Sequence, residues 1–219
     1  MTIALGINFG DYVLLAADTR VTYQFWGAKI GYRDDREKIQ KTSMGIITGA
    51  GSVDLLDAVK DRLAEKQIVN SDEVFEAVKE ERLRLLNLGI INQDFVSMTG
   101  WLFSYMTVVD DKPKLRLDLV HPSLAEGSVR WEENKLAIIF PIEIEKNQAD
   151  GIANELNELV KPSSKFSSIN ESFQYHCAIA RELIKLIQPD CPSVSRFYQF
   201  GVHTIHNQVE ISKIFSVDS

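Results

Sequence analysis

The sequence has few cysteines and no long apolar run, and these absences exclude several classes of protein. Cys177 and Cys191 are the only cysteines, and they form neither a Cys-x-x-Cys motif nor a disulfide framework. This usage is typical of a reducing, cytoplasmic compartment. No apolar run approaches the roughly 18 residues of a membrane span, and no signal peptide is apparent. We therefore expect a cytoplasmic protein with no membrane partner.

A basic surface for nucleic acid is also missing. The 24 Lys and Arg residues are scattered and are outnumbered by 31 Asp and Glu residues, which gives a net charge of -7. Binding to a phosphate backbone depends on clustered positive charge. We therefore expect no nucleic-acid partner.

Signatures of metal and nucleotide sites are absent as well. His203 and His206 are three residues apart on a predicted strand, so their side chains point to opposite faces and do not suit one metal ion. The only glycine cluster, GAGS at 49–52, lacks the lysine that would bind a phosphate. The sequence therefore predicts no metal and no cofactor.

Hydrophobic periodicity predicts strands, two helices, strands, two helices and strands, in that order. Strands are expected within residues 2–9, 12–18, 38–48, 100–109, 115–119, 195–205 and 209–215. Helices are expected to begin after Ser52 and to occupy residues 71–88, 149–160 and 169–188. Residues 23–37 suggest a protruding loop or ribbon, and a hairpin is expected to join 129–131 to 135–141. The order favours one α+β domain over residues 1–219, with two sheets between helical layers.

Asp18 ends an apolar strand, YVLLAAD, and therefore needs a partner. A buried carboxylate costs several kcal/mol unless a cation or hydrogen-bond donors meet it. Arg20, two residues on, is one candidate partner at the end of the strand. The alternative is that Asp18 belongs to a functional site, which depends on what else lies beside it.

Thr2 would become the first residue of the chain if Met1 were removed. A terminal threonine can use its hydroxyl as nucleophile and its own α-amine, with a pKa of about 7.7 to 8.0, as base. Nucleophile and base then share one residue, and no histidine is needed. The alternative is an ordinary strand that begins with Met-Thr.

Four motifs occur in order: MTIALGIN, VLLAADTRVT, REKIQK and ITGAGS. Their order and spacing resemble the catalytic β-subunits of proteasomes and the bacterial proteasome-like peptidases, which are N-terminal-nucleophile hydrolases. The resemblance implies a four-layer αββα sandwich of two antiparallel sheets between helical layers. It also implies that Thr2 is the nucleophile, Asp18 the buried acid and Lys38 the catalytic lysine. Gly51 would provide an oxyanion-hole amide.

The resemblance extends to further residues. Arg20 matches the basic residue beside the acid, and Thr22 matches a substrate contact through the backbone. The resemblance implies that both, together with Gly49, bind substrate. Asp190 and Ser193 match an Asp-x-x-Ser motif that supports the N-terminal residue, although a turn that ends a helix would explain them equally well.

Two departures from the family pattern concern this supporting set. The segment FPIEIEKNQADGIAN has no Gly-Ser-Gly turn before the third long helix, and Val194 follows Ser193 where the family commonly has glycine. Both departures lie in the part of the pattern that would support Thr2, so this chain is a divergent match to the family.

The function that the resemblance implies is threonine-type hydrolysis of peptide bonds in peptides or unfolded proteins. It also implies a homo-oligomeric ring, with an ATP-dependent unfoldase as a candidate partner. Two alternatives stay open. One is a non-catalytic ring or scaffold subunit, and the other is an N-terminal-nucleophile amidase that acts on small molecules.

Overall fold

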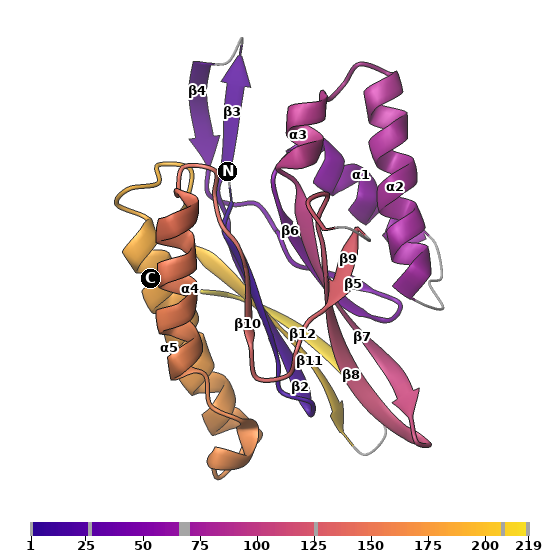
Figure 1. Cartoon of the computed structure of the whole chain (residues 1–219), viewed down its shortest axis with the longest axis vertical. Coiled ribbons are helices and arrows are strands. Elements are labelled where there is room, and N and C mark those ends of the chain that lie inside the picture. The colour runs from indigo at the N-terminus through magenta and orange to yellow at the C-terminus, as the bar shows by residue number, and fades with distance from the viewer. Residues whose placement is uncertain (1, 26–27, 66–70, 125–126, 207–208, 218–219) are drawn as a thin grey trace.

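The first of two antiparallel sheets has the strand order β10-β1-β2-β11-β12 (Figure 1). This computed structural model describes the chain apart from residues 1, 26–27, 66–70, 125–126, 207–208 and 218–219. The strands of the first sheet are β1 (Ala4–Asn8), β2 (Tyr12–Asp18), β10 (Leu136–Ile139), β11 (Tyr198–His206) and β12 (Val209–Val217). Every residue of β1 and β2 is buried, which explains why this part of the sequence is so apolar.

The second sheet has the order β5-β6-β7-β8-β9. Its strands are β5 (Gln40–Thr42), β6 (Gly45–Ala50), β7 (Gly100–Val109), β8 (Lys112–Val120) and β9 (Ser128–Arg130). A separate two-stranded ribbon, β3 (Val21–Phe25) and β4 (Ala28–Arg33), projects beyond the sheets (Figure 1). This ribbon confirms the protrusion that the mixed composition of 23–37 predicts.

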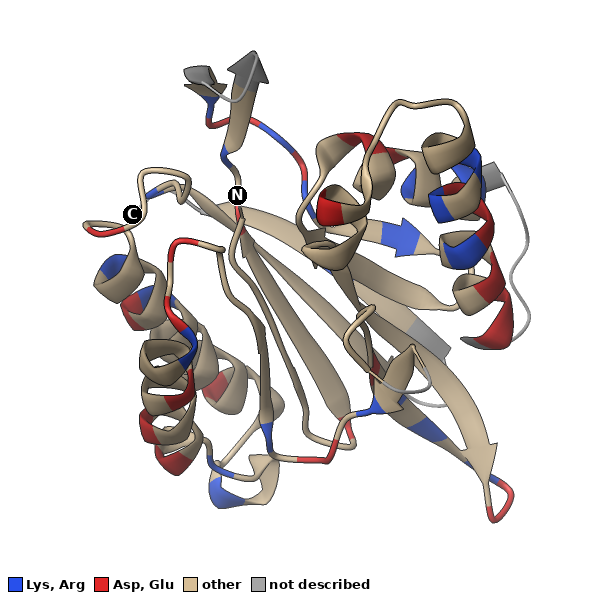
Figure 2. Cartoon of the chain, turned by 45° about the horizontal axis from the view of Figure 1, so that its top comes forward, with Lys and Arg blue, Asp and Glu red and all other residues tan. Residues whose placement is uncertain are grey.

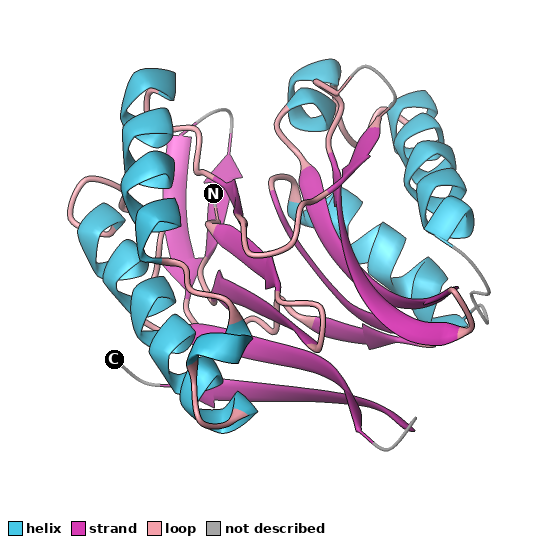
Figure 3. Cartoon of the chain, turned by 60° about the horizontal axis from the view of Figure 1, so that its bottom comes forward, coloured by secondary structure: helices cyan, strands magenta, loops and turns pink. Residues whose placement is uncertain are grey.

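Helices cover the outer faces of both sheets (Figure 3). Helices α4 (Lys146–Leu159) and α5 (Ile169–Ile187) lie against the first sheet, joined by a short 3-10 helix (Ser163–Lys165). Helices α1 (Val53–Glu65), α2 (Ser71–Asn87) and the short α3 (Gln93–Ser97) lie beside the second sheet. Side chains from the two sheets form a further core between them, which includes Leu15, Leu102 and Leu117.

The predicted strands and helices agree with these elements except at two places. Helix α3 has no counterpart in the prediction, because five residues are too few to show a helical period. The predicted hairpin that joins 129–131 to 135–141 is wrong. Strand β9 pairs with β8 in the second sheet, whereas β10 pairs with β1 in the first. The intervening residues pass from one sheet to the other, and local alternation cannot tell such a crossing from a turn.

His203 links the two sheets, and its burial predicts that the folded protein is less stable in acid. Its Nδ1 lies 3.0 Å from Ser104 Oγ of β7, and burial lowers the pKa of His203 from 6.5 to about 4. The unfolded chain therefore binds a proton more readily than the folded one. The contribution of neutral His203 to the free energy of unfolding is fully present above pH 6.5. It decreases as the pH falls through 4, by up to about 3 kcal/mol in total.

Urea unfolding at pH 7 and pH 4.5 will measure this loss. A His203→Gln variant keeps a polar partner for Ser104 but cannot bind the proton, so its stability will fall less between the two pH values. An equal fall in the variant and in the parent protein would contradict the assignment.

Candidate active site

Thr2 and Asp18 meet at one end of the first sheet. Thr2 lies two residues before Ala4, the first residue of β1, and Asp18 is the last residue of β2. The two strands are antiparallel, with Ala4 opposite Ala17, so the beginning of one lies beside the end of the other. Both side chains are buried, with Thr2 3% exposed and Asp18 fully enclosed. Sheet topology alone therefore brings these two residues together.

Donors surround the Asp18 carboxylate on both oxygens. Oδ1 accepts a hydrogen bond from the Ile3 amide at 3.0 Å and lies 3.9 Å from Lys38 Nζ. Oδ2 accepts from the amides of Arg20 at 2.9 Å and Ser195 at 3.0 Å. Burial raises the pKa of Asp18, while Lys38 and these three amides oppose the rise. Charge and donors thus compensate for the lost hydration that burial of a carboxylate entails.

Lys38 connects the acid to the threonine. Its Nζ donates hydrogen bonds to Thr2 Oγ1 and to the Arg20 carbonyl, and it forms the ion pair with Asp18. The side chain is buried, and burial lowers the pKa of Lys38 although the nearby Asp18 raises it. A lysine with a lowered pKa gives up its proton more easily, so this group is suited to proton transfer at the Thr2 hydroxyl.

The backbone of Lys38 is held by two polar side chains in the interior. Gln199 Oε1, from β11, accepts from the Lys38 amide at 2.7 Å, and Lys60 Nζ, from α1, donates to the Lys38 carbonyl at 2.7 Å. Both residues are buried. Because β11 belongs to the first sheet and α1 covers the second, Lys38 is fixed from both halves of the fold.

Gly51 follows β6 and faces the beginning of β7. Its φ of +128 lies in the region that disfavours residues with a side chain, and a Cβ here would lie 2.5 Å from Thr99 Cα. Thr99 Oγ1 accepts from the neighbouring Ser52 amide at 2.9 Å. Glycine is therefore required both by the backbone conformation and by the close approach of Thr99.

The chain was next compared with known proteins. No family model matches it, and no curated protein matches it significantly. Among solved structures, it is similar to the (Gly-1) mutant of Anbu from Hyphomicrobium sp. strain MC1, with a TM-score of 0.66 and 14% identity. The match covers 100% of this chain and 88% of the other.

This chain shares its fold with Anbu.

The similarity supports the predicted fold, a mixed α/β chain with two antiparallel sheets. At 14% identity the chemistry must be argued from the residues of this chain. In this fold Lys38 contacts both Thr2 and Asp18, so the three residues form one contact cluster.

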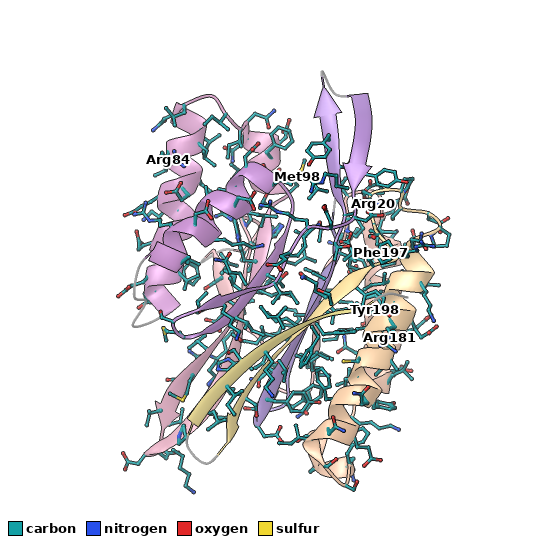
Figure 4. The ribbon with its side chains drawn as sticks, turned by 180° about the vertical axis from the view of Figure 1, so that it is seen from behind. Arg20, Arg84, Met98, Arg181, Phe197 and Tyr198 are labelled. Atoms are coloured by element: carbon teal, nitrogen blue, oxygen red, sulfur yellow. The ribbon has the colours of Figure 1, made fainter. Side chains whose placement is uncertain are left out.

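The side chain of Arg20 is not the partner of Asp18, so the alternative of a strand-end pair between these two side chains is wrong. Its guanidinium binds both oxygens of Asp34 at 2.7 Å, donates to the Pro192 carbonyl at 2.7 Å and stacks over Tyr32. Figure 4 shows Arg20 at the base of the ribbon, near Phe197. The backbone of Arg20 contributes to the cluster through its amide and carbonyl, and its side chain fixes the ribbon.

The other predicted residues differ in their relation to the cluster. Thr22 lies on β3, with an Oγ1 that has no hydrogen-bond partner among the residues that the structure describes. Gly49 lies inside β6, where a Cβ would come 2.7 Å from the Gly100 carbonyl, so close packing accounts for it. Ser193 is buried near the Arg20–Pro192 contact, and its Oγ likewise lacks a described partner.

Asp190 is not brought into the cluster. It is exposed at the end of α5, where its amide donates to the Ile187 carbonyl, and no described contact joins its side chain to Thr2, Asp18 or Lys38. The segment 140–145 replaces the Gly-Ser-Gly turn, and Glu145 precedes α4 without a capping hydrogen bond from its side chain. Both observations concern the supporting part of the predicted site.

Three residues that shape the site were not predicted from the sequence: Ser195, Gln199 and Lys60. Ser195 contributes a backbone amide, which leaves no trace in the residue type. Lys60 did leave a signal, because it lies on the apolar face of α1 four residues after Leu56 and beside Val59. A lysine at a core position usually has a specific partner, here the Lys38 carbonyl.

The described residues lack two further features, a membrane-spanning helix and a metal site. In that part of the chain, no helix is long and apolar enough to cross a membrane. Nor does any group of three His, Cys, Asp or Glu side chains among those residues have the arrangement of a metal site.

Proposed function

We propose that the chain is a threonine-type peptidase that uses Thr2 as its nucleophile after Met1 is removed. The observation that carries this proposal is the hydrogen bond from Lys38 Nζ to Thr2 Oγ1 beside the buried Asp18. A positive lysine next to the free α-amine would lower the pKa of that amine by like-charge repulsion and favour the neutral base. Nucleophile, base and charge partner then lie within one enclosed cluster.

The proposed reaction has two stages. The α-amine takes the proton of the Thr2 hydroxyl, while Oγ1 bonds to the substrate carbonyl carbon. The Gly51 amide would stabilise the resulting oxyanion, an effect of about 3 to 4 kcal/mol in comparable sites. The C–N bond then breaks, the leaving nitrogen receives the proton, and water hydrolyses the ester to regenerate Thr2. Ser193 would support the N-terminal residue, a role for which its buried hydroxyl has no competing partner among the described residues.

We extend the proposal to architecture and assembly. The chain would form one domain with the four-layer αββα arrangement of N-terminal-nucleophile hydrolases. Copies would assemble into homo-oligomeric rings that admit peptides or unfolded proteins, and an ATP-dependent unfoldase would deliver folded substrates. Analytical ultracentrifugation tests the ring directly, since a monomer at micromolar concentration would contradict it.

Intact-mass spectrometry with a peptide epoxyketone tests the nucleophile. The reagent needs both the amine and the hydroxyl of a terminal threonine to close its ring. We expect loss of Met1 and one adduct, which Thr2→Ser retains and Thr2→Ala lacks, together with at least about a thousandfold lower peptide hydrolysis in Thr2→Ala. Protein that retains Met1 is first treated with an aminopeptidase.

The same experiment separates the alternatives. A chain that begins at Thr2 and forms neither adduct nor product would contradict the peptidase, and an intact ring would then indicate a scaffold subunit. Hydrolysis of small amides but not of peptides would instead indicate an amidase with the same nucleophile.

A further inference from the structure

A cavity of about 700 Å³ lies between the β3–β4 ribbon, the segment from β4 to β5, and α1. Its wall includes Val21 and Ile39, which directly follow Arg20 and Lys38 in the sequence. The Arg20 carbonyl and the Lys38 side chain are hydrogen-bonded to each other. The cavity wall is therefore one residue away in the sequence from Lys38, whose Nζ contacts Thr2 Oγ1.

Lys60 is the buried charge of this cavity. Its side chain is only 6% exposed, and it lies behind the Lys38 carbonyl, to which Nζ donates at 2.7 Å. An ammonium group has three hydrogen-bond donors, and this contact uses one of them. The remaining donors are available to a group that enters the cavity.

Charges nearer the solvent largely offset one another. Figure 2 shows both signs along the segment from β4 to β5. Arg36 is paired with Asp57, and Arg33 with Asp35, whose side chains are 64% and 63% exposed. The other charged residues of the cavity lie at its exposed edge and have both signs: Glu37, Lys41 and Asp61. Water screens such exposed charges, whereas a buried ammonium keeps its attraction for an anion.

We propose that this cavity accepts a substrate side chain that bears a carboxylate, next to the bond that is cut, and that Lys60 selects it. The inference rests on the proposed peptidase function and names its substrate class. The carboxylate would accept a charge-assisted hydrogen bond from Lys60 Nζ, which is stronger than the bond that an uncharged amide of the same shape would form.

The selectivity will depend on pH in a defined direction. Burial lowers the pKa of Lys60 to about 8. Four charged groups face it: Asp57 and Asp61 from α1, which raise this pKa, and Arg36 and Lys38 from the segment before β5, which lower it. Lys60 is charged below pH 8 and loses its charge above it. Preference for a carboxylate is therefore present at pH 7 and lost by pH 9.5.

Binding to the Thr2→Ala protein tests the proposal without turnover. Two fluorescent peptides, acetylated and amidated so that no terminal carboxylate remains, differ only in Glu or Gln at one position. By anisotropy at pH 7 we expect the Glu peptide to bind about tenfold more tightly. Lys60→Met will remove this difference. Lys60→Arg will keep it even at pH 9.5, and the exposed Lys79→Met on α2 is the control that leaves it unchanged.

The outcomes distinguish this inference from the peptidase itself. Equal binding of the two peptides, no binding of either, or a difference that survives Lys60→Met would overturn the inference. If Lys60→Met fails to fold, Lys60→Arg at pH 9.5 decides, since loss of the preference there overturns the role of the charge. Selective binding without hydrolysis by the Thr2 protein would instead contradict only the peptidase, while hydrolysis without a Glu preference would contradict only the cavity assignment.

Discussion

Replacement of Asp18 by asparagine will strongly reduce both stability and peptide hydrolysis. Oδ1 accepts from Ile3 and faces Lys38, while Oδ2 accepts from Arg20 and Ser195. Asparagine has the same shape but only one acceptor oxygen, so its amino group must face donors on one side. The Lys38 ammonium also remains buried without its counter-charge. Breaking a buried pair in this way costs about 3 to 5 kcal/mol.

Hydrolysis will fall for a related reason. Lys38 Nζ contacts Thr2 Oγ1 and Asp18 together, so loss of the carboxylate changes both the position and the proton affinity of the lysine. We expect a decrease of about a hundredfold or more in kcat at pH 7. Urea unfolding and peptide turnover measure the two effects.

The matched control is the same substitution at an exposed ion pair. Asp35→Asn removes a carboxylate that is 63% exposed and paired with Arg33, and its stability will change by less than about 1 kcal/mol. If Asp18→Asn were as stable as the parent protein, the negative charge at this position would have no structural role.

The central cluster was predictable because Thr2, Asp18 and Lys38 lie in motifs whose order resembles that of proteasome β-subunits. From the residues alone, only the carboxylate at the end of an apolar strand was unusual. The strand pairing then makes the contact necessary, since β1 begins where β2 ends. Here local pattern and tertiary structure favour the same arrangement.

The remaining part of the site depends on contacts between distant segments. Ser195 reaches Asp18 only through its backbone, and Gln199 holds Lys38 from a strand 161 positions away. The Arg20 guanidinium forms a bidentate pair with Asp34, in which two N–H groups bind the two carboxylate oxygens. The oxygens of the enclosed Asp18 are instead bound by backbone amides. Neither periodicity nor spacing indicates these choices.

Lys60 could be predicted from the sequence only in part. Its position on the apolar face of α1 was visible, but the reason for a lysine there appears only when the Lys38 carbonyl and the charged cavity are placed beside it. The same helix thus packs against the second sheet through its apolar residues and extends one charged group toward the cluster. Helix α1 therefore carries both its packing residues and Lys60 on the same face.

Substitution of Gly51 by alanine will have the second large effect. The φ of +128 strains any residue with a Cβ, and the added methyl would lie 2.5 Å from Thr99 Cα, so the backbone must move. Thr99 Oγ1 also accepts from the Ser52 amide at 2.9 Å and donates to the Phe95 carbonyl, which ties this turn to α1 and α3. Strain and overlap together will cost about 3 kcal/mol or more.

Displacement of the Gly51 amide will also reduce hydrolysis, by about a hundredfold to a thousandfold if that amide meets the oxyanion. Gly89→Ala is the control, because Gly89 has a φ of +67 but open space around the added Cβ. It isolates the conformational strain, expected at about 1 to 2 kcal/mol, and should leave turnover unchanged. Chemical unfolding of both variants measures the loss of stability, and their kcat values measure the loss of hydrolysis. If Gly51→Ala lost only as much stability as Gly89→Ala and kept full activity, the oxyanion donor would have to lie elsewhere in the fold.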